Sequence, residues 1–205
     1  MMFTVIRLPV DGQAQIKNGY NFTINDRSNF YDWYNAYFEV QFQLLNKADG
    51  EGYANADRAT VVNGGHSLIK HLTIKSAGKI VYDTDNLHNL TFVEHLLEYS
   101  DDFSRSEKNS FWYLNTDATT ANTNTGYEAR KLLTKAARDD ALNAGLKDVN
   151  ILIPLNRYSF FEELEDKLLV PMRLQFEISL NDDDELIHKA HGADDGRIVF
   201  NRFLL

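Results

Sequence analysis

Two long runs with a period of two constrain the fold of this 205-residue chain more than any other feature. In residues 36–44 and in residues 170–180 every even-numbered position is apolar, and the positions between them are mostly polar. Successive side chains of a strand point to opposite faces of a sheet, so each run predicts a long strand with one buried face. Both are typical of antiparallel sheets.

Shorter strand candidates lie along the rest of the chain, at residues 19–24, 58–63, 68–74, 80–83, 110–114, 149–154 and 197–205. Residues 76–79 predict a hairpin turn between two of them. Pro171 falls inside the second long run, and because proline donates no ladder hydrogen bond, it predicts an edge position or a bulge.

Two segments show helical spacing. In residues 87–99 apolar residues recur three and four positions apart, with Asp85 or Asn86 available to cap the start. Residues 127–143 repeat the pattern, and a short helical turn is expected at residues 160–164. Strands along the whole chain without a repeating βα unit favour an all-β fold with inserted helices, an antiparallel β-sandwich.

Composition excludes several classes of protein. The absence of cysteine excludes a disulfide scaffold, a zinc finger, an iron–sulfur site and a thiol nucleophile. A net charge of −9 argues against a nucleic-acid-binding domain, which needs a basic face. There is no apolar run long enough to span a membrane, and Arg7 interrupts the first apolar residues too early for a secretory signal.

The sequence shows no domain boundary. The polar stretches at residues 48–59 and 116–125 have the length of loops, and no internal repeat is present. We therefore expect residues 1–205 to form a single domain.

The histidines and acidic residues offer one candidate metal cluster. His188 and His191 lie three apart between two acidic runs, residues 182–185 and residues 194–195. A solvated acidic hairpin tip explains this segment more simply. His66 and His71 lack the spacing of a metal-binding cupin barrel, and no catalytic motif is present, so we expect no catalytic, cofactor or metal site.

An aromatic cluster lies at the start of the first long run: Phe30, Tyr31, Trp33, Tyr34, Tyr37, Phe38 and Phe42. Phe38 and Phe42 fit the core, with Tyr31, Trp33 and Tyr34 closing one end of the sandwich. An interface with another protein is an equally good interpretation, because tyrosine and tryptophan concentrate binding energy. Stacking on sugar rings is a third.

Short motifs follow one another in a characteristic order: residues 68–74, 79–83, 87–100, 111–113 with Asp117, 124–126 with Arg130, 153–155 and 168–180. In this order, over about residues 35–205, the chain resembles the first jelly roll of the double-jelly-roll major capsid proteins of Polinton-like and adintovirus-like elements. In that family a helix begins near an Asn-Leu pair and ends in a Leu-Leu-x-Tyr-type sequence, as residues 96–99 do here.

The resemblance implies a structural protein of the virion, not an enzyme. Three chains of the family form a capsomer that tiles an icosahedral shell, which implies self-association as a homotrimer, with no cofactor, no direct nucleic-acid binding and no membrane span. The family carries two jelly rolls in one chain. We therefore expect either the N-terminal half of a longer chain or a single-jelly-roll relative, with an apolar end, residues 200–205, exposed for another domain to dock.

Two other functions compete with the capsid interpretation. A carbohydrate-binding β-sandwich would use the aromatic cluster, with calcium at the acidic tip, and would show saturable glycan binding. A cupin-like metalloenzyme would use the histidines and would carry a transition metal.

Overall fold

The structure, a computed structural model, describes residues 19–25, 28–48, 50–53, 59–98, 107–113, 124–134, 147–189 and 195–205. The strands are β1 (Gly19–Ile24), β2 (Tyr37–Asn46), β3 (Ala59–Val61), β4 (Ile69–Ser76), β5 (Lys79–Thr84), β6 (Val149–Pro154), β7 (Leu174–Leu180), β8 (Ile187–Lys189) and β9 (Gly196–Leu204). The helices are α1 (Leu87–Glu98), α3 (Thr125–Thr134), α4 (Ser159–Glu162) and α5 (Asp183–Leu186), with 3₁₀ turns η1 (Gly65–Leu68), η2 (Glu107–Ser110) and η3 (Leu155–Arg157).

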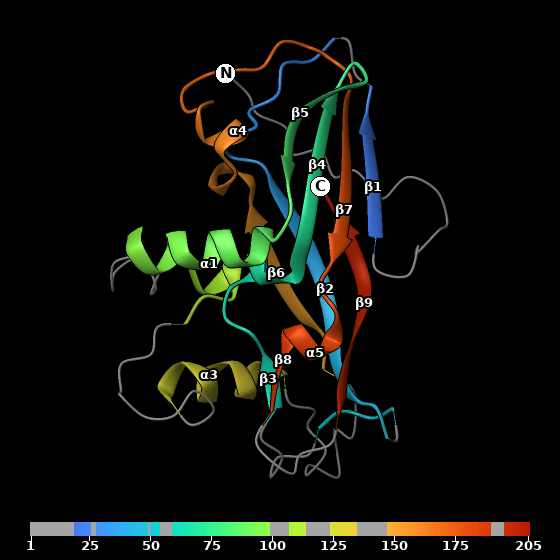
Figure 1. Cartoon of the computed structure of the whole chain (residues 1–205), viewed down its shortest axis with the longest axis vertical. Coiled ribbons are helices and arrows are strands. Elements are labelled where there is room, and N and C mark those ends of the chain that lie inside the picture. The colour runs from blue at the N-terminus through green and yellow to red at the C-terminus, as the bar shows by residue number, and fades with distance from the viewer. Residues whose placement is uncertain are drawn as a thin grey trace.

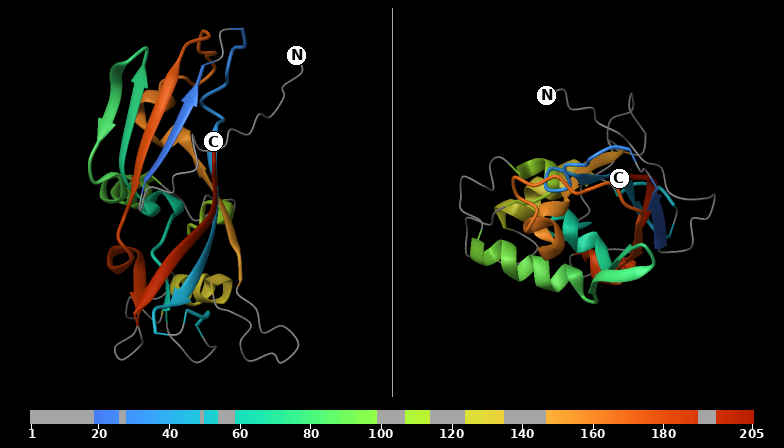
Figure 2. Two further views of the ribbon diagram at one scale, coloured as in Figure 1. Left: turned by 90° about the vertical axis from the view of Figure 1, so that its right-hand side faces the viewer. Right: turned by 90° about the horizontal axis from the view of Figure 1, so that it is seen from above.

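The strands form antiparallel sheets built from segments far apart in the sequence (Figure 1). One sheet has the order β1-β7-β4-β5, a second has the order β6-β2-β9, and β3 pairs with β8 in a short third sheet. Every pairing between these strands is antiparallel. This confirms the predicted fold class, an antiparallel β-sandwich with helices inserted in its connections; Figure 2 shows it from two further sides.

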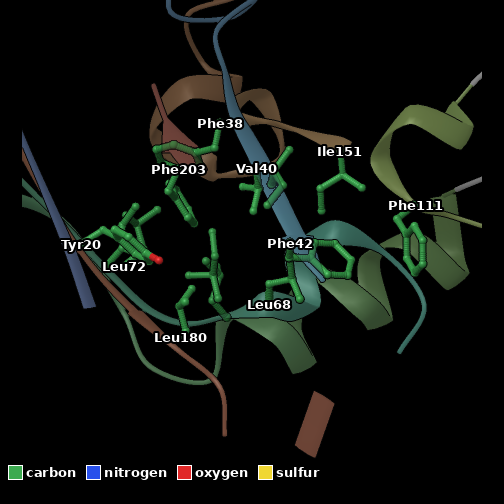
Figure 3. Close-up of a cluster of buried hydrophobic side chains, with 14 of the residues drawn as sticks. Tyr20, Phe38, Val40, Phe42, Leu68, Leu72, Phe111, Ile151, Leu180 and Phe203 are labelled. Carbon is green, nitrogen blue, oxygen red and sulfur yellow. The ribbon is translucent and has the colours of Figure 1, made fainter. Parts of the chain in front are cut away.

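The core lies between the two larger sheets and is lined by the two alternating runs. Phe38, Val40 and Phe42 on β2 are fully buried (Figure 3). Phe176 on β7 is fully buried as well. The rings of Phe38 and Phe176 meet edge to face with centroids 6.3 Å apart, so the two runs touch across the sandwich. The period-two prediction is thus confirmed for the buried face of each strand.

The second long run is shorter as a strand than predicted. β7 begins at Leu174, and Pro171 lies before it. The edge position predicted from Pro171 is wrong, since β7 is a central strand that pairs with β1 on one side and β4 on the other. A central strand needs its backbone N–H groups on both sides, so it starts after the proline.

The hairpin turn between β4 and β5 is confirmed. Ala77 and Gly78 have φ angles of 48° and 84°, the left-handed pair that a tight two-residue hairpin requires. The strand expected at residues 110–114 is wrong within the described part, because η2 runs into a turn at Phe111 that buries Phe111 and Trp112. Their apolar character comes from burial and not from strand pairing.

No helix among the described residues is both long enough and apolar enough to span a membrane.

Candidate interaction surface

Helix α1 turns its apolar residues outward. An amphipathic helix normally buries its apolar side, but α1 buries Leu87, Thr91 and His95 instead. The outward apolar side chains are 39 to 82% exposed; they are Leu90, Phe92, Val93, Leu96 and Leu97. In Figure 1 the helix projects sideways beyond the foot of β5. This outward face, which we call the α1 face, is therefore open over most of the helix length.

The helix starts where its sequence indicates, and Asn86, one of the two residues expected to cap it, directly precedes its first residue. The backbone carbonyl of Asn86 accepts hydrogen bonds from the N–H groups of Asn89 and Leu90, at 3.0 and 3.2 Å. Asn86 itself has a φ of 57°, a conformation that asparagine tolerates better than most residues. The side chain of Asp85 hydrogen-bonds to His71.

The buried side of α1 rests on a polar and aromatic joint, which we call the histidine joint: His66, His95, Trp112 and Tyr158. His66, on η1, and His95, on α1, meet edge to face with ring centroids 4.9 Å apart. His66 Nδ1 lies 3.0 Å from the Tyr158 hydroxyl. This geometry explains the orientation of α1, because the helix must present His95 inward to complete the joint.

Burial sets the protonation state of the joint. Desolvation by burial, helped by the positive charge of Arg157, lowers the pKa of His95 to about 3. Burial, with His95 and Arg157 nearby, also lowers the pKa of His66 well below its usual value. Both imidazoles are therefore neutral at neutral pH.

The pair His66–His95 was not predicted from the sequence, in which His66 was compared only with His71 and the two were found to lack a metal-binding spacing. The structure separates these two, because His71 lies on β4 near the surface, between the carboxylates of Asp83 and Asp85. Its Nε2 is 2.6 Å from Thr73 Oγ1. Residues brought together by tertiary structure alone leave no spacing signal, so this pair could not be found in advance.

The acidic run at residues 182–185 is largely exposed, as predicted, but it is not a hairpin tip. It forms most of the one-turn helix α5, and the strands on either side, β7 and β8, lie in different sheets. Asp183 Oδ1 accepts a hydrogen bond of 2.8 Å from the backbone N–H of Ile198, which ties α5 to β9. The described residues hold no group of three or more histidine or carboxylate side chains placed to bind a metal.

Of the two histidines of the candidate metal cluster, the structure describes only His188. His188 lies on β8 opposite Thr60, and burial, with the charge of Arg130, lowers its pKa. Asp195 pairs with Lys189. His191 and Asp194 lie outside the described residues, so the absence of a metal at this place stays a prediction.

The aromatic cluster mostly closes the sandwich. Trp33, Phe38 and Phe42 are buried, and the Trp33 ring lies 5.6 Å from the rings of both Phe161 and Phe176. Buried rings offer no platform for a sugar. Phe30, with 61% of its surface exposed, is the member that faces solvent most openly.

The apolar end of the chain is largely packed into the core and not left exposed as expected. Phe203 is 3% exposed and lies in the core, and Phe200 and Leu205 pack against it. Strand β9 pairs with β2 along most of its length, which gives its apolar residues an inner face.

Arg130 is a buried cation that attaches α3 to the short sheet. Its Nε donates a hydrogen bond of 3.1 Å to the backbone carbonyl of Val61 on β3. Desolvation by burial lowers the pKa of Arg130 to about 10. The side chain thus holds helix and strand together, which is a structural role.

No protein-family model matches this sequence, and no curated protein matches it. Among solved structures, the crystal structure of the mavirus major capsid protein aligns with 97% of this chain and 45% of that chain, with a TM-score of 0.52 and 8% identity. The 3.5 Å cryo-EM structure of the Sputnik virophage aligns with 100% of this chain and 48% of that chain, with a TM-score of 0.46 and 13% identity. This chain spans less than half the length of each, and at such identity the likeness to the mavirus protein concerns the fold.

Proposed function

We propose that this chain is a structural protein of a virion: a capsid-type jelly roll that associates with copies of itself into a trimeric capsomer. The observation that carries the proposal is the fold that it shares with the mavirus major capsid protein over 97% of its own length. Fold alone does not determine function, so a second, independent feature of this chain is needed.

The α1 face supplies that feature. Exposed apolar patches of a few hundred square ångströms on a soluble protein commonly mark interaction sites, and five apolar side chains stand open on this one helix. A second copy of the chain is the partner that the proposal assigns to it. Capsid assembly also needs no catalytic apparatus, in keeping with the tertiary roles found for Asp183, Arg130 and the histidine joint.

The proposal extends to points that rest on sequence resemblance. It places the chain in the Polinton-like and adintovirus-like type, treats residues 1–205 as one jelly-roll domain, and locates the protein in the virion shell, without enzymatic activity or direct nucleic-acid binding. The net charge of −9 supports the last point.

Light scattering over a wide range of protein concentration tests the proposal. We expect a trimer or a larger closed assembly, and we expect Leu96→Lys with Leu97→Lys to shift it to monomer. Lysine is chosen because it makes the net charge of the chain less negative. Loss of association could then not be explained by stronger electrostatic repulsion between copies. Ile80→Lys is the matched control, since Ile80 on β5 is also well exposed, at 59%.

A monomer at every concentration contradicts self-association of this chain. If the wild type assembles and the two-lysine variant assembles equally well, the fold-based proposal stands and the α1 face is excluded as the contact.

A further inference from the structure

We propose that the neutral histidine pair of the joint acts as a latch for α1, and that protonation of this pair at acidic pH releases the helix from the body of the domain. The proposal concerns the chain itself and does not depend on capsid assembly.

The attachment of α1 is narrow, and His95 is central to it. The helix touches the body mainly at η1 and β4, through a buried side made of Leu87, Thr91 and His95. The ring of Phe92 adds an edge contact, with its centroid 6.0 Å from that of Trp112. Thr91 Oγ1 donates to the carbonyl of Leu87, so its hydroxyl proton is used within the helix itself. His95 alone of the three brings an aromatic ring, 5.1 Å from the ring of Trp112.

The histidine joint cannot readily hold a protonated imidazole. His66 and His95 are 1% and 3% exposed, and their ring centroids are 4.9 Å apart. His66 Nε2 has no hydrogen-bond partner in the described part of the chain. A proton added to either ring would leave a charge without water, and protons on both would place like charges side by side.

The charged groups around the joint oppose protonation. Arg157, on η3, lowers the pKa of both histidines and binds Glu98 on α1, with Nη1 to Oε2 at 3.3 Å. Burial, with Glu98 and Glu162, raises the pKa of Glu94, which also faces Arg157.

Acidification therefore removes negative charge at Glu94 while it adds positive charge at the pair, and both changes leave the region beneath α1 more positive. At the other end of the helix, His88 is half-buried between Lys70 and Glu185, and burial lowers its pKa as well. Burial raises the pKa of Tyr82, whose ring lies 6.3 Å from that of Tyr158, so Tyr82 stays protonated throughout the acidic range.

The size of the effect follows from linkage. A histidine that is neutral in the docked helix and has its ordinary pKa near 6.5 once freed favours the open state about 30-fold more at pH 5.0 than at pH 7.5. Freeing both His66 and His95 multiplies these factors to about 10³.

Hydrogen exchange followed by mass spectrometry on the full chain measures this opening directly. We expect the opening constant of the α1 amides, corrected for intrinsic exchange rates, to rise at least 30-fold from pH 7.5 to pH 5.0. The amides of β2 should remain much more protected than those of α1 at both pH values, since the latch opens α1 locally. In His95→Phe, which keeps an aromatic ring against Trp112, the rise should be cut by about 30-fold.

Two further variants keep the test decisive. His95→Gln is an uncharged polar replacement in case phenylalanine does not fit, and His188→Gln, on β8, is a control histidine outside the joint that should respond as the wild type does. The proposal is overturned if α1 opens equally at both pH values, if both His95 variants keep the full acid response, or if β2 opens together with α1.

Discussion

The phenol ring of Tyr20 stacks on the ring of Phe203 with centroids 4.5 Å apart and an interplanar angle of 25°. Tyr20 belongs to β1 in the four-stranded sheet, and Phe203 belongs to β9 in the three-stranded sheet, so this stack joins the two layers. Phe203 also lies within 6 Å of the rings of Phe22 and Phe38, at 5.9 and 5.4 Å. One side chain near the end of the chain thus holds together strands from its beginning.

Removing the ring of Phe203 should destabilise the domain strongly. We expect Phe203→Ala to lower the free energy of unfolding by about 3–5 kcal/mol, because the substitution leaves a cavity among three aromatic partners. Urea unfolding followed by circular dichroism measures the change. Phe30→Ala is the matched control, and it should cost no more than about 0.5 kcal/mol at a side chain that is 61% exposed. Equal losses in the two variants would contradict the role given to Phe203.

Gly196, the first residue of β9, has no room for a side chain. A Cβ atom there would lie 2.8 Å from both Ile187 Cδ1 and the hydroxyl oxygen of Tyr53. We expect Gly196→Ala to cost about 1–3 kcal/mol through overpacking.

The same unfolding assay can compare this variant with Gly78→Asn. Gly78 has a φ of 84° in the hairpin turn and nothing within 4 Å of its Cβ position, and asparagine accepts that conformation. The asparagine variant should therefore retain nearly all the stability. A stable Gly196→Ala would mean that β8 and β9 are less closely packed than the structure shows.

Local pattern predicted much of the fold. β1 and β6 have the predicted bounds, and the period of two identified the buried faces of β2 and β7. These predictions succeeded because strand alternation is a property of neighbouring residues in the chain. The start of α1 and the turn at residues 76–79 were found for the same reason.

The candidate site could not be predicted in this way. The apolar spacing of α1 correctly indicates a helix, but the side that it buries is decided by η1, which presents His66 and requires His95 in return. Likewise, the edge position predicted from Pro171 was wrong because the order of strands in a sheet, which makes β7 central, is a tertiary property. The three-residue strand β8 carries too little sequence to show a period.

The two neighbouring aspartates of α5 should differ in their effect on stability. Asp183→Ala removes the acceptor for the backbone N–H of Ile198, so we expect a loss of about 1–2 kcal/mol in the free energy of unfolding. Asp184→Ala should change it by less than about 0.5 kcal/mol, because the Asp184 side chain is 88% exposed and meets Lys47 only at 3.8 Å.

Thermal melts at low and high salt separate the two roles. The Asp183→Ala loss should persist at high salt, since it comes from a specific hydrogen bond. A loss of equal size in both variants, or one that vanishes with salt, would show that the acidic run acts through its overall charge.

The stability of the whole domain should fall on acidification through the histidine joint. The folded pKa of His95 is about 3 and that of an unfolded histidine is near 6.5, so the unfolded chain binds the proton first. The stabilisation is therefore complete above pH 6.5 and is lost as the pH falls from 6.5 toward 3. For His95 alone the loss between pH 7.5 and pH 5.0 is about 2 kcal/mol.

Urea unfolding of the wild type and of His95→Phe at pH 7.5, 6.0 and 5.0 measures this loss. Carboxylates contribute equally to both proteins, so a comparison of the two free energies of unfolding isolates His95. Between pH 7.5 and pH 5.0 the wild type should lose about 2 kcal/mol more than His95→Phe. Equal losses in the two proteins would show that His95 keeps its ordinary pKa in the folded state.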